Sequence, residues 1–208
     1  MLSTISSGYK LLLLLILITI AGESQASKTI LILGDSLSAG HGIKQGENWT
    51  DLLQQRFNDK KIDAQLINAS ISGDTSANGL NRLPGVLKQY QPDWLIIELG
   101  GNDGLRGLPI RHIQNNLESL VQTGLNFGTK VLLMTIRIPP NYGKKYTRAF
   151  SRIYPELAHK YSLILLPFII NDLALNPDMM QADGIHPNGK AQADIMEELW
   201  QSLKPLLE

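Results

Sequence analysis

The segment Ile30-Leu31-Ile32-Leu33-Gly34-Asp35-Ser36 decides the fold, because a continuous apolar run ends there in a Gly-Asp turn and a serine. Further apolar runs of strand length follow along the chain: Ala64–Ile67, Trp94–Leu99, Val131–Ile136 and Leu163–Leu166. These runs are continuous rather than alternating, which is typical of strands that are buried on both faces of a parallel sheet. The pattern therefore predicts a central parallel sheet of about five strands.

Segments of helical length separate these predicted strands. We expect helices over Asn48–Phe57, Ser76–Tyr90, Ile113–Leu125, Thr147–Tyr161 and Asn188–Leu206. Pro84 should break the second of these helices or start a new one, and Pro155 interrupts the pattern of the fourth. The alternation predicts a doubly wound α/β domain, in which ligands bind beyond the carboxyl ends of the strands.

The first 26 residues have the three parts of a secretory signal peptide. Lys10 precedes an almost unbroken apolar run over residues 11–20, and Ser24-Gln25-Ala26 supplies small residues at the −3 and −1 positions. An uncleaved membrane anchor is the alternative, but spanning a bilayer takes roughly 20 apolar residues. We therefore expect cleavage after Ala26, with residues 27–208 forming one exported domain.

The composition argues against several function classes. The chain has no cysteine, so it needs no disulfide bonds and has no thiol nucleophile or cysteine-ligated metal. Its formal net charge is zero, and no lysine- or arginine-rich block marks a nucleic-acid-binding surface. The sequence contains no His-Glu-x-x-His motif and no P-loop or dinucleotide-binding glycine spacing, so we expect no metal ion or nucleotide cofactor.

Two short motifs supply the parts of a serine hydrolase. In Gly34-Asp35-Ser36-Leu37-Ser38, the serine presents a hydroxyl at the carboxyl edge of the sheet, although alone it could simply cap a helix. In Asp183-Gly184-Ile185-His186-Pro187, one tight turn can hold the carboxylate against imidazole Nδ1 and leave Nε2 free. We therefore predict Ser36 as the nucleophile, His186 as the base and Asp183 as the acid that orients the base.

Two other residues have the chemistry of oxyanion donors, alongside the backbone N–H of Ser36. Gly73 follows the second predicted strand, where the absent Cβ lets a backbone N–H approach a ligand. Asn102 offers a side-chain amide in Gly100-Gly101-Asn102-Asp103, although either residue could simply form a turn. His41 lies close to Ser36 in sequence and competes for the role of base, but no carboxylate is obvious beside it.

These motifs resemble those of the SGNH (GDSL-type) hydrolases, whose four letters fall in order on Ser36, Gly73, Asn102 and His186, with Asp183 matching the acid of that family. The resemblance spans nearly the whole chain after the signal segment. It implies a flavodoxin-like three-layer α/β/α sandwich, a Ser-His-Asp triad, and an oxyanion hole formed by Ser36, Gly73 and Asn102. It also implies a periplasmic enzyme without a cofactor. We further expect a monomeric, periplasmic or secreted enzyme that uses no metal and has no membrane anchor once the signal is cleaved.

Loops after the third and fourth predicted strands bear on the substrate. They contain the candidate substrate-binding residues Leu105, Arg106, Gly107, Leu108, Pro109, Ile138, Pro139 and Tyr142. We expect these loops to line an acyl groove, which favours a hydrolase of small-molecule fatty-acyl thioesters and carboxylic esters; ordinary loop packing is the alternative. Two alternatives remain: a carbohydrate acetylesterase of the same family, and a non-catalytic binding protein on the same scaffold. A profile of activity against acyl chain length separates the two hydrolases, and an assay with a chromogenic ester separates both from the binding protein.

Overall fold

The computed structural model describes residues 27–207, so the expected signal segment and its cleavage point after Ala26 lie outside the described residues. A five-stranded sheet with the order β2-β1-β3-β4-β5 forms the centre, and every strand pair is parallel. The strands are β1 (Lys28–Gly34), β2 (Ala64–Asn68), β3 (Trp94–Glu98), β4 (Lys130–Met134) and β5 (Ile164–Leu166). Each strand overlaps one of the apolar runs, which confirms the predicted sheet.

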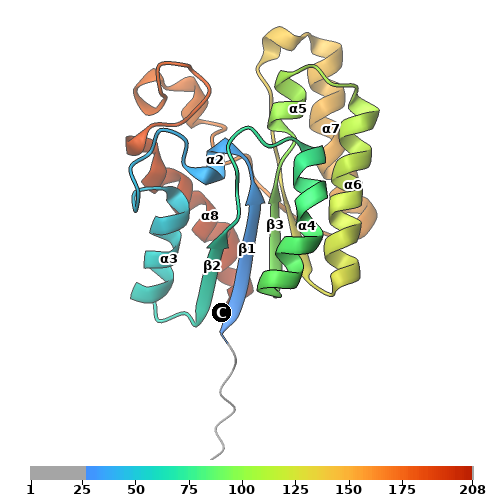
Figure 1. Ribbon diagram of the computed structural model, residues 1–208. Coiled ribbons are helices and arrows are strands. Elements are labelled where there is room, and N and C mark those ends of the chain that lie inside the picture. The colour runs from blue at the N-terminus through green and yellow to red at the C-terminus, as the bar shows by residue number, and fades with distance from the viewer. Residues whose placement is uncertain (1–26, 208) are drawn as a thin grey trace, which may run out of the picture.

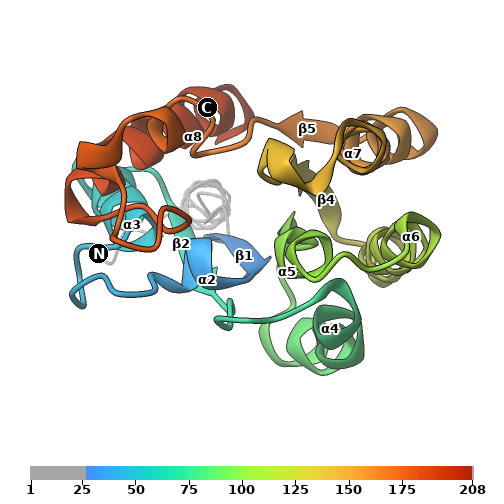
Figure 2. The ribbon, with the colours of Figure 1, turned by 90° about the horizontal axis from the view of Figure 1, so that it is seen from above.

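Helices cover both faces of this sheet (Figures 1 and 2). The helices α3 (Trp49–Asp59) and α8 (Gln192–Leu207) contribute to one hydrophobic cluster, whereas α4 (Ser76–Tyr90), α6 (Ile110–Phe127) and α7 (Lys144–Tyr161) contribute to the other. Along β1, Ile30 and Ile32 belong to the first cluster and Leu31 and Leu33 to the second. Both faces of the strand are therefore buried, which explains the continuous apolar run and confirms the three-layer sandwich.

The proline in α4 does not break the helix as expected. The helix continues from Ser76 to Tyr90 through Pro84, and α7 likewise continues through Pro155. A proline inside a helix costs about 3 kcal/mol, whereas burial of Leu83 and Leu87 contributes roughly 3–6 kcal/mol in all. Packing of α4 against the sheet therefore outweighs the local cost of the proline.

Short elements lie in the connections between the long ones. They are α2 (Ser36–Ala39), α5 (Gly101–Leu105) and the 3₁₀ turns η1 (Pro140–Tyr142), η2 (Leu173–Leu175), η3 (Pro177–Met179) and η4 (Gly189–Ala191). The chain leaves β1 for β2 on one side and reaches β3 on the other, so the strand order switches at β1. Such a switch creates a crevice at the carboxyl ends of the strands, where α2 and α5 begin (Figure 1). In residues 27–207, none of the helices is long and apolar enough to cross a membrane.

Candidate active site

The turn after β1 places Ser36 at the carboxyl edge of the sheet. Ser36 is the first residue of α2, and the Asp35 side chain caps this short helix by accepting a hydrogen bond from the Leu37 N–H at 3.2 Å. Gly34 makes this turn possible, because a Cβ there would lie 2.6 Å from Glu98 Oε2 on the neighbouring strand. The hydroxyl of Ser36 is therefore held by a capped turn that only glycine allows to pack so closely.

The loop before α8 brings an acid and an imidazole to that hydroxyl. Asp183 Oδ1 accepts hydrogen bonds from the backbone N–H groups of Ile185 and His186, at 2.9 and 3.0 Å. The bond from the His186 N–H contributes most to lowering the pKa of Asp183 to about 2, and the bonds from the His186 side chain and the Ile185 N–H add to it. This carboxyl group is therefore ionised at neutral pH. Asp183 Oδ2 lies 2.6 Å from His186 Nδ1. A carboxylate can only accept, so Nδ1 carries the proton and Nε2 is left as an acceptor.

The free nitrogen of His186 faces the serine. His186 Nε2 lies 2.9 Å from Ser36 Oγ, which joins Ser36, His186 and Asp183 in one hydrogen-bonded chain. His41 packs its ring against the His186 ring, with centroids 4.5 Å apart and an interplanar angle of 44°. The competing histidine is therefore a neighbour of the imidazole that contacts the serine.

The side chain of Asn102 connects the turn that carries Ser36 with the turn that contains Gly73. Asn102 Nδ2 donates to Asp35 Oδ2 at 3.1 Å and to the carbonyl oxygen of Asp74 at 3.0 Å. Gly73 precedes Asp74 and has a φ of +86°, which favours glycine. The structure thus brings the Ser36, Gly73 and Asn102 segments together, while both amide hydrogens of Asn102 are directed at protein acceptors.

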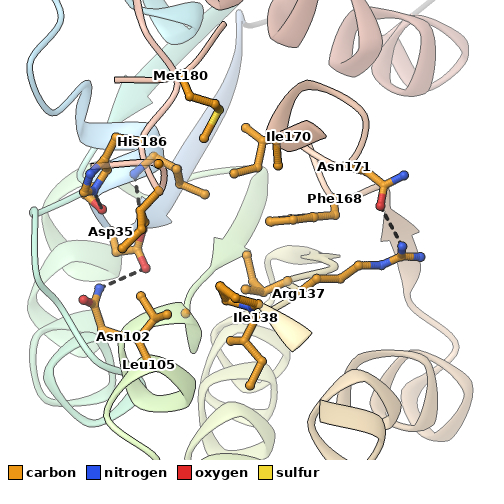
Figure 3. Close-up of a pocket in the computed structure, with 18 of the residues that line it drawn as sticks. Asp35, Asn102, Leu105, Arg137, Ile138, Phe168, Ile170, Asn171, Met180 and His186 are labelled. Atoms are coloured by element: carbon orange, nitrogen blue, oxygen red, sulfur yellow. Dashed lines mark hydrogen bonds between the residues drawn. The ribbon is translucent and has the colours of Figure 1, made fainter. Parts of the chain in front are cut away.

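A cavity of about 630 Å³ opens beside Ser36 and His186 (Figure 3). Its apolar lining residues are Leu37, Leu105, Ile136, Ile138, Pro139, Pro140, Phe168, Ile170, Ala174, Leu175, Met180 and Ile185. Arg137 and Asn171 also line it, and Arg137 Nη1 donates to Asn171 Oδ1 at 2.6 Å. Ser36 and His186 therefore lie in the wall of a largely apolar cavity.

Only part of the predicted substrate-binding set lines this cavity. Leu105, Ile138 and Pro139 do, whereas the other five predicted residues do not: Arg106, Gly107, Leu108, Pro109 and Tyr142. Leu108 packs against the hydrophobic cluster on the α4, α6 and α7 side, and the Tyr142 hydroxyl donates to the Leu105 carbonyl at 2.8 Å. Arg106 Nη2 donates to the Gly73 carbonyl at 3.2 Å. These contacts brace the loops, which corrects the expectation that their whole length forms the groove.

Sequence reasoning missed the wall formed by residues 168–185. Phe168, Ile170, Leu175 and Met180 come from the connection between β5 and the His186 loop. This connection contains only short 3₁₀ turns, so its apolar residues follow neither a helical nor a strand period. The only signal in the sequence that could have revealed this wall is the high proportion of apolar residues just before the motif that contains Asp183.

Comparison with known proteins agrees with this geometry. A family model described as GDSL-like Lipase/Acylhydrolase matches residues 32–193. Esterase TesA of Pseudomonas aeruginosa is 47% identical over 195 residues, covering 94% of this chain and 96% of the relative. Thioesterase 1/protease 1/lysophospholipase L1 of Escherichia coli K12 is 46% identical over 193 residues, covering 93% and 91%.

A solved structure, of the psychrotrophic esterase EstA from a Pseudoalteromonas species inhibited by monoethylphosphonate, superposes with a TM-score of 0.84. It is 45% identical and covers 86% of this chain and 98% of its own. These matches confirm the resemblance drawn from the motifs. The chain therefore belongs to the GDSL-like lipase/acylhydrolase family and is a serine hydrolase of esters and thioesters.

Proposed function

We propose that this enzyme cleaves fatty-acyl thioesters and carboxylic esters through an acyl-enzyme formed on Ser36. The observation that carries the proposal is the hydrogen-bonded chain from Ser36 through His186 to Asp183 in the wall of an apolar cavity. Relatives named as an esterase, a thioesterase and lysophospholipase, and an arylesterase support the same class of substrate.

The reaction begins when Ser36 Oγ attacks the acyl carbon while His186 Nε2 takes the hydroxyl proton. Asp183 stabilises the imidazolium that results, because its carboxylate accepts the Nδ1 hydrogen bond. His186 then gives the proton to the departing alkoxide or thiolate, and the acyl group remains on Ser36. Water, deprotonated by His186, attacks this ester and releases the acid and the free serine.

Negative charge on the substrate oxygen is received by the backbone N–H groups of Ser36 and Gly73 and by Asn102 Nδ2. Donors aimed at this charge are worth most in the transition state. Since both N–H groups of Asn102 already have acceptors, the amide must redirect one of them from Asp35 or Asp74 when the charge develops. Asp35 and Asp74 hold the amide in place until then.

The cavity favours an acyl chain as the group bound next to Ser36. Each methylene buried from water contributes up to ~0.8 kcal/mol, a factor of about four in transition-state binding. A carbohydrate acetylesterase would gain nothing from this apolar wall. We also propose that residues 1–26 export the enzyme, that it acts as a monomer in the periplasm or medium, and that it binds no nucleic acid and needs no membrane anchor.

A serine-directed phosphonate tests the nucleophile, and acyl esters of increasing length test the substrate. The phosphonate should label Ser36 alone, and Ser36→Ala should lose both labelling and turnover while Ser119→Ala on the surface of α6 keeps both. Labelling of another residue, or activity in Ser36→Ala, would overturn the assignment. A preference for acetyl esters would contradict the fatty-acyl substrate and favour the hypothesis of a carbohydrate acetylesterase.

A further inference from the structure

Glu98 is a buried acid directly beneath the nucleophile turn, and the reaction above gives it no role. It ends β3 and has no exposed surface. Glu98 Oε2 accepts hydrogen bonds from the Asp35 N–H at 3.1 Å and from Ser38 Oγ at 2.8 Å. Glu98 Oε1 is also buried and receives no N–H or O–H donor from the described part of the chain. An ionised Glu98 would therefore leave one charged oxygen unsolvated, which is expensive in a protein interior.

The neighbouring carboxyl group adds to this cost. Asp35 is itself buried, its backbone N–H contacts Glu98 Oε2, and its carboxyl group interacts with that of Glu98. Burial raises the pKa of Asp35 to about 6. Burial, and then the charge of Asp35, raises the pKa of Glu98 well above its usual range. Two adjacent carboxyl groups do not both ionise, because like charges at this distance repel.

Within residues 27–207, no cation is positioned to offset a second negative charge on the pair. The other titratable or charged side chains near it are Arg82 on α4, Asp103 on α5, Tyr154 on α7 and His186 on the loop before α8. Arg82 is paired with Asp74 at 2.7 Å, and Tyr154 and Asp103 add no positive charge. Only a protonated His186 attracts the Asp35 carboxylate. A proton held within the pair is therefore the remaining way to satisfy both groups.

We propose that Glu98 is a neutral acid and a positioning residue, which holds the nucleophile turn through Oε2 and donates its proton to Asp35 so that Asp35 can hold and release the oxyanion donor Asn102. This inference rests on the proposed function of Ser36 and Asn102. Asp35 Oδ2 accepts from Asn102 Nδ2 in the resting enzyme, while Asp35 Oδ1 accepts from Leu37 N–H. When Asn102 turns an N–H to the substrate oxygen, Asp35 keeps the Leu37 N–H and the Glu98 proton, so no bare carboxylate is left.

Loss of the Glu98 proton should slow the reaction for two reasons. A second negative charge would then lie beneath the site where the substrate oxygen becomes negative. The Asp35 carboxylate would also lose the donor from Glu98 and compete more strongly for Asn102. Glu98→Gln imitates the neutral acid, since its amide oxygen can accept from Asp35 and Ser38 and its N–H can donate to Asp35. Unlike Glu98 it cannot ionise, and its amide carries one further N–H.

Infrared spectroscopy of the purified enzyme at pH 7 tests the protonation state without reference to activity. We expect a carbonyl-stretch band from a protonated carboxyl group that disappears in Glu98→Gln. It should remain in Asp103→Asn, the matched control, which removes another fully buried acid, one that accepts two hydrogen bonds from Ser76. If wild type lacks the band, or Glu98→Gln retains it, the proposal is overturned. If Glu98→Gln fails to fold, absence of the band from the wild-type spectrum would still overturn the proposal.

The rate profile against pH tests the positioning role. Wild type should lose kcat at alkaline pH, whereas Glu98→Gln should keep its activity within about threefold at pH 7 and lack this alkaline decline. An inactive Glu98→Gln with an unchanged melting temperature would show that an ionised Glu98 is needed, and the proposal would fail. An alkaline decline of equal size in both proteins would also overturn it. Phosphonate labelling of Ser36 is measured in parallel, so that failure of the nucleophile assignment is recognised separately.

Discussion

Leu175 offers the sharpest test of the acyl-binding cavity, because it lines the cavity and yet is 84% exposed. Replacing an exposed leucine changes the free energy of unfolding by about 0.5 kcal/mol or less. Leu175→Ser should therefore leave the fold intact while removing part of the apolar wall. Any change in substrate preference then reports on binding and not on stability.

The expected magnitude follows from the area that the acyl chain covers. Each added methylene contributes up to ~0.8 kcal/mol, which is about fourfold in kcat/KM. Leu175 forms one part of the wall, so its loss should remove roughly the equivalent of one methylene contact, again about fourfold, for chains long enough to reach it. Acetyl esters, which end near Ser36, should change by less than about twofold.

The assay is kcat/KM for chromogenic esters and matching thioesters from acetyl to dodecanoyl, plotted as the logarithm against carbon number. Leu125→Ser is the matched control, since Leu125 is a partly exposed leucine on α6 that does not line the cavity. Wild type and the control should rise together, and Leu175→Ser should rise less steeply. A flat wild-type plot, or equal flattening by the control, would refute the assignment of the cavity to the acyl chain.

Three other perturbations test the site. Asn102→Ala should lower kcat by roughly 100- to 1,000-fold with little change in KM, the usual effect of removing one oxyanion donor. The control Asn116→Ala on α6 should leave kcat unchanged. A rise in KM with kcat unchanged would make Asn102 a substrate-binding residue. Asp183→Asn should lower kcat by up to about 10⁴-fold, because the amide no longer holds His186 with its proton on Nδ1 and Nε2 as the acceptor; a variant that keeps wild-type kcat would assign the orienting acid to another residue. The pKa of Glu98 is higher in the native state than in the unfolded state, so the native state keeps a proton that the unfolded state loses. The free energy of unfolding of wild type should therefore fall as pH rises above about 4.5. Denaturant titrations at pH 5 and pH 8 should show a smaller fall in Glu98→Gln, and equal falls would contradict the assignment.

The fold follows from the sequence because burial on both faces leaves a local signature. Residues 30–33 form a continuous apolar run, and only a two-faced strand needs every side chain to be apolar. The Pro84 prediction failed because its evidence was local, whereas the packing of Leu83 and Leu87 that sustains the helix depends on the sheet. Tertiary contacts of that kind leave no mark on the neighbouring sequence.

The contact between Asp183 and His186 was predictable for a related reason. Asp183 and His186 interact across one turn, so a spacing of three residues already fixes their contact. The cavity wall could not be predicted in this way. Phe168 and Met180 lie in a connection without a helical or strand period, and only the folded chain brings them to the same cavity as Leu105. Leu108 shows the converse error, since an apolar residue in the right loop turned toward the core instead. Sequence thus predicts contacts made within a turn better than contacts made between distant loops.

The position of Glu98 could be predicted neither from the pattern of apolar residues nor from contacts within one turn. In sequence, Glu98 is the charged residue just before the last position of the run over residues 94–99, and a polar residue at that point would usually be assigned to the solvated end of a strand. In the structure it is fully buried, and the close approach that buries it requires a glycine at position 34, because any Cβ there would meet Glu98 Oε2. A buried acid costs stability, and sites that break a local rule in this way are commonly functional. The pairing of Gly34 with Glu98 across β1 and β3 therefore places a destabilising group where it can act on the turn that carries the nucleophile.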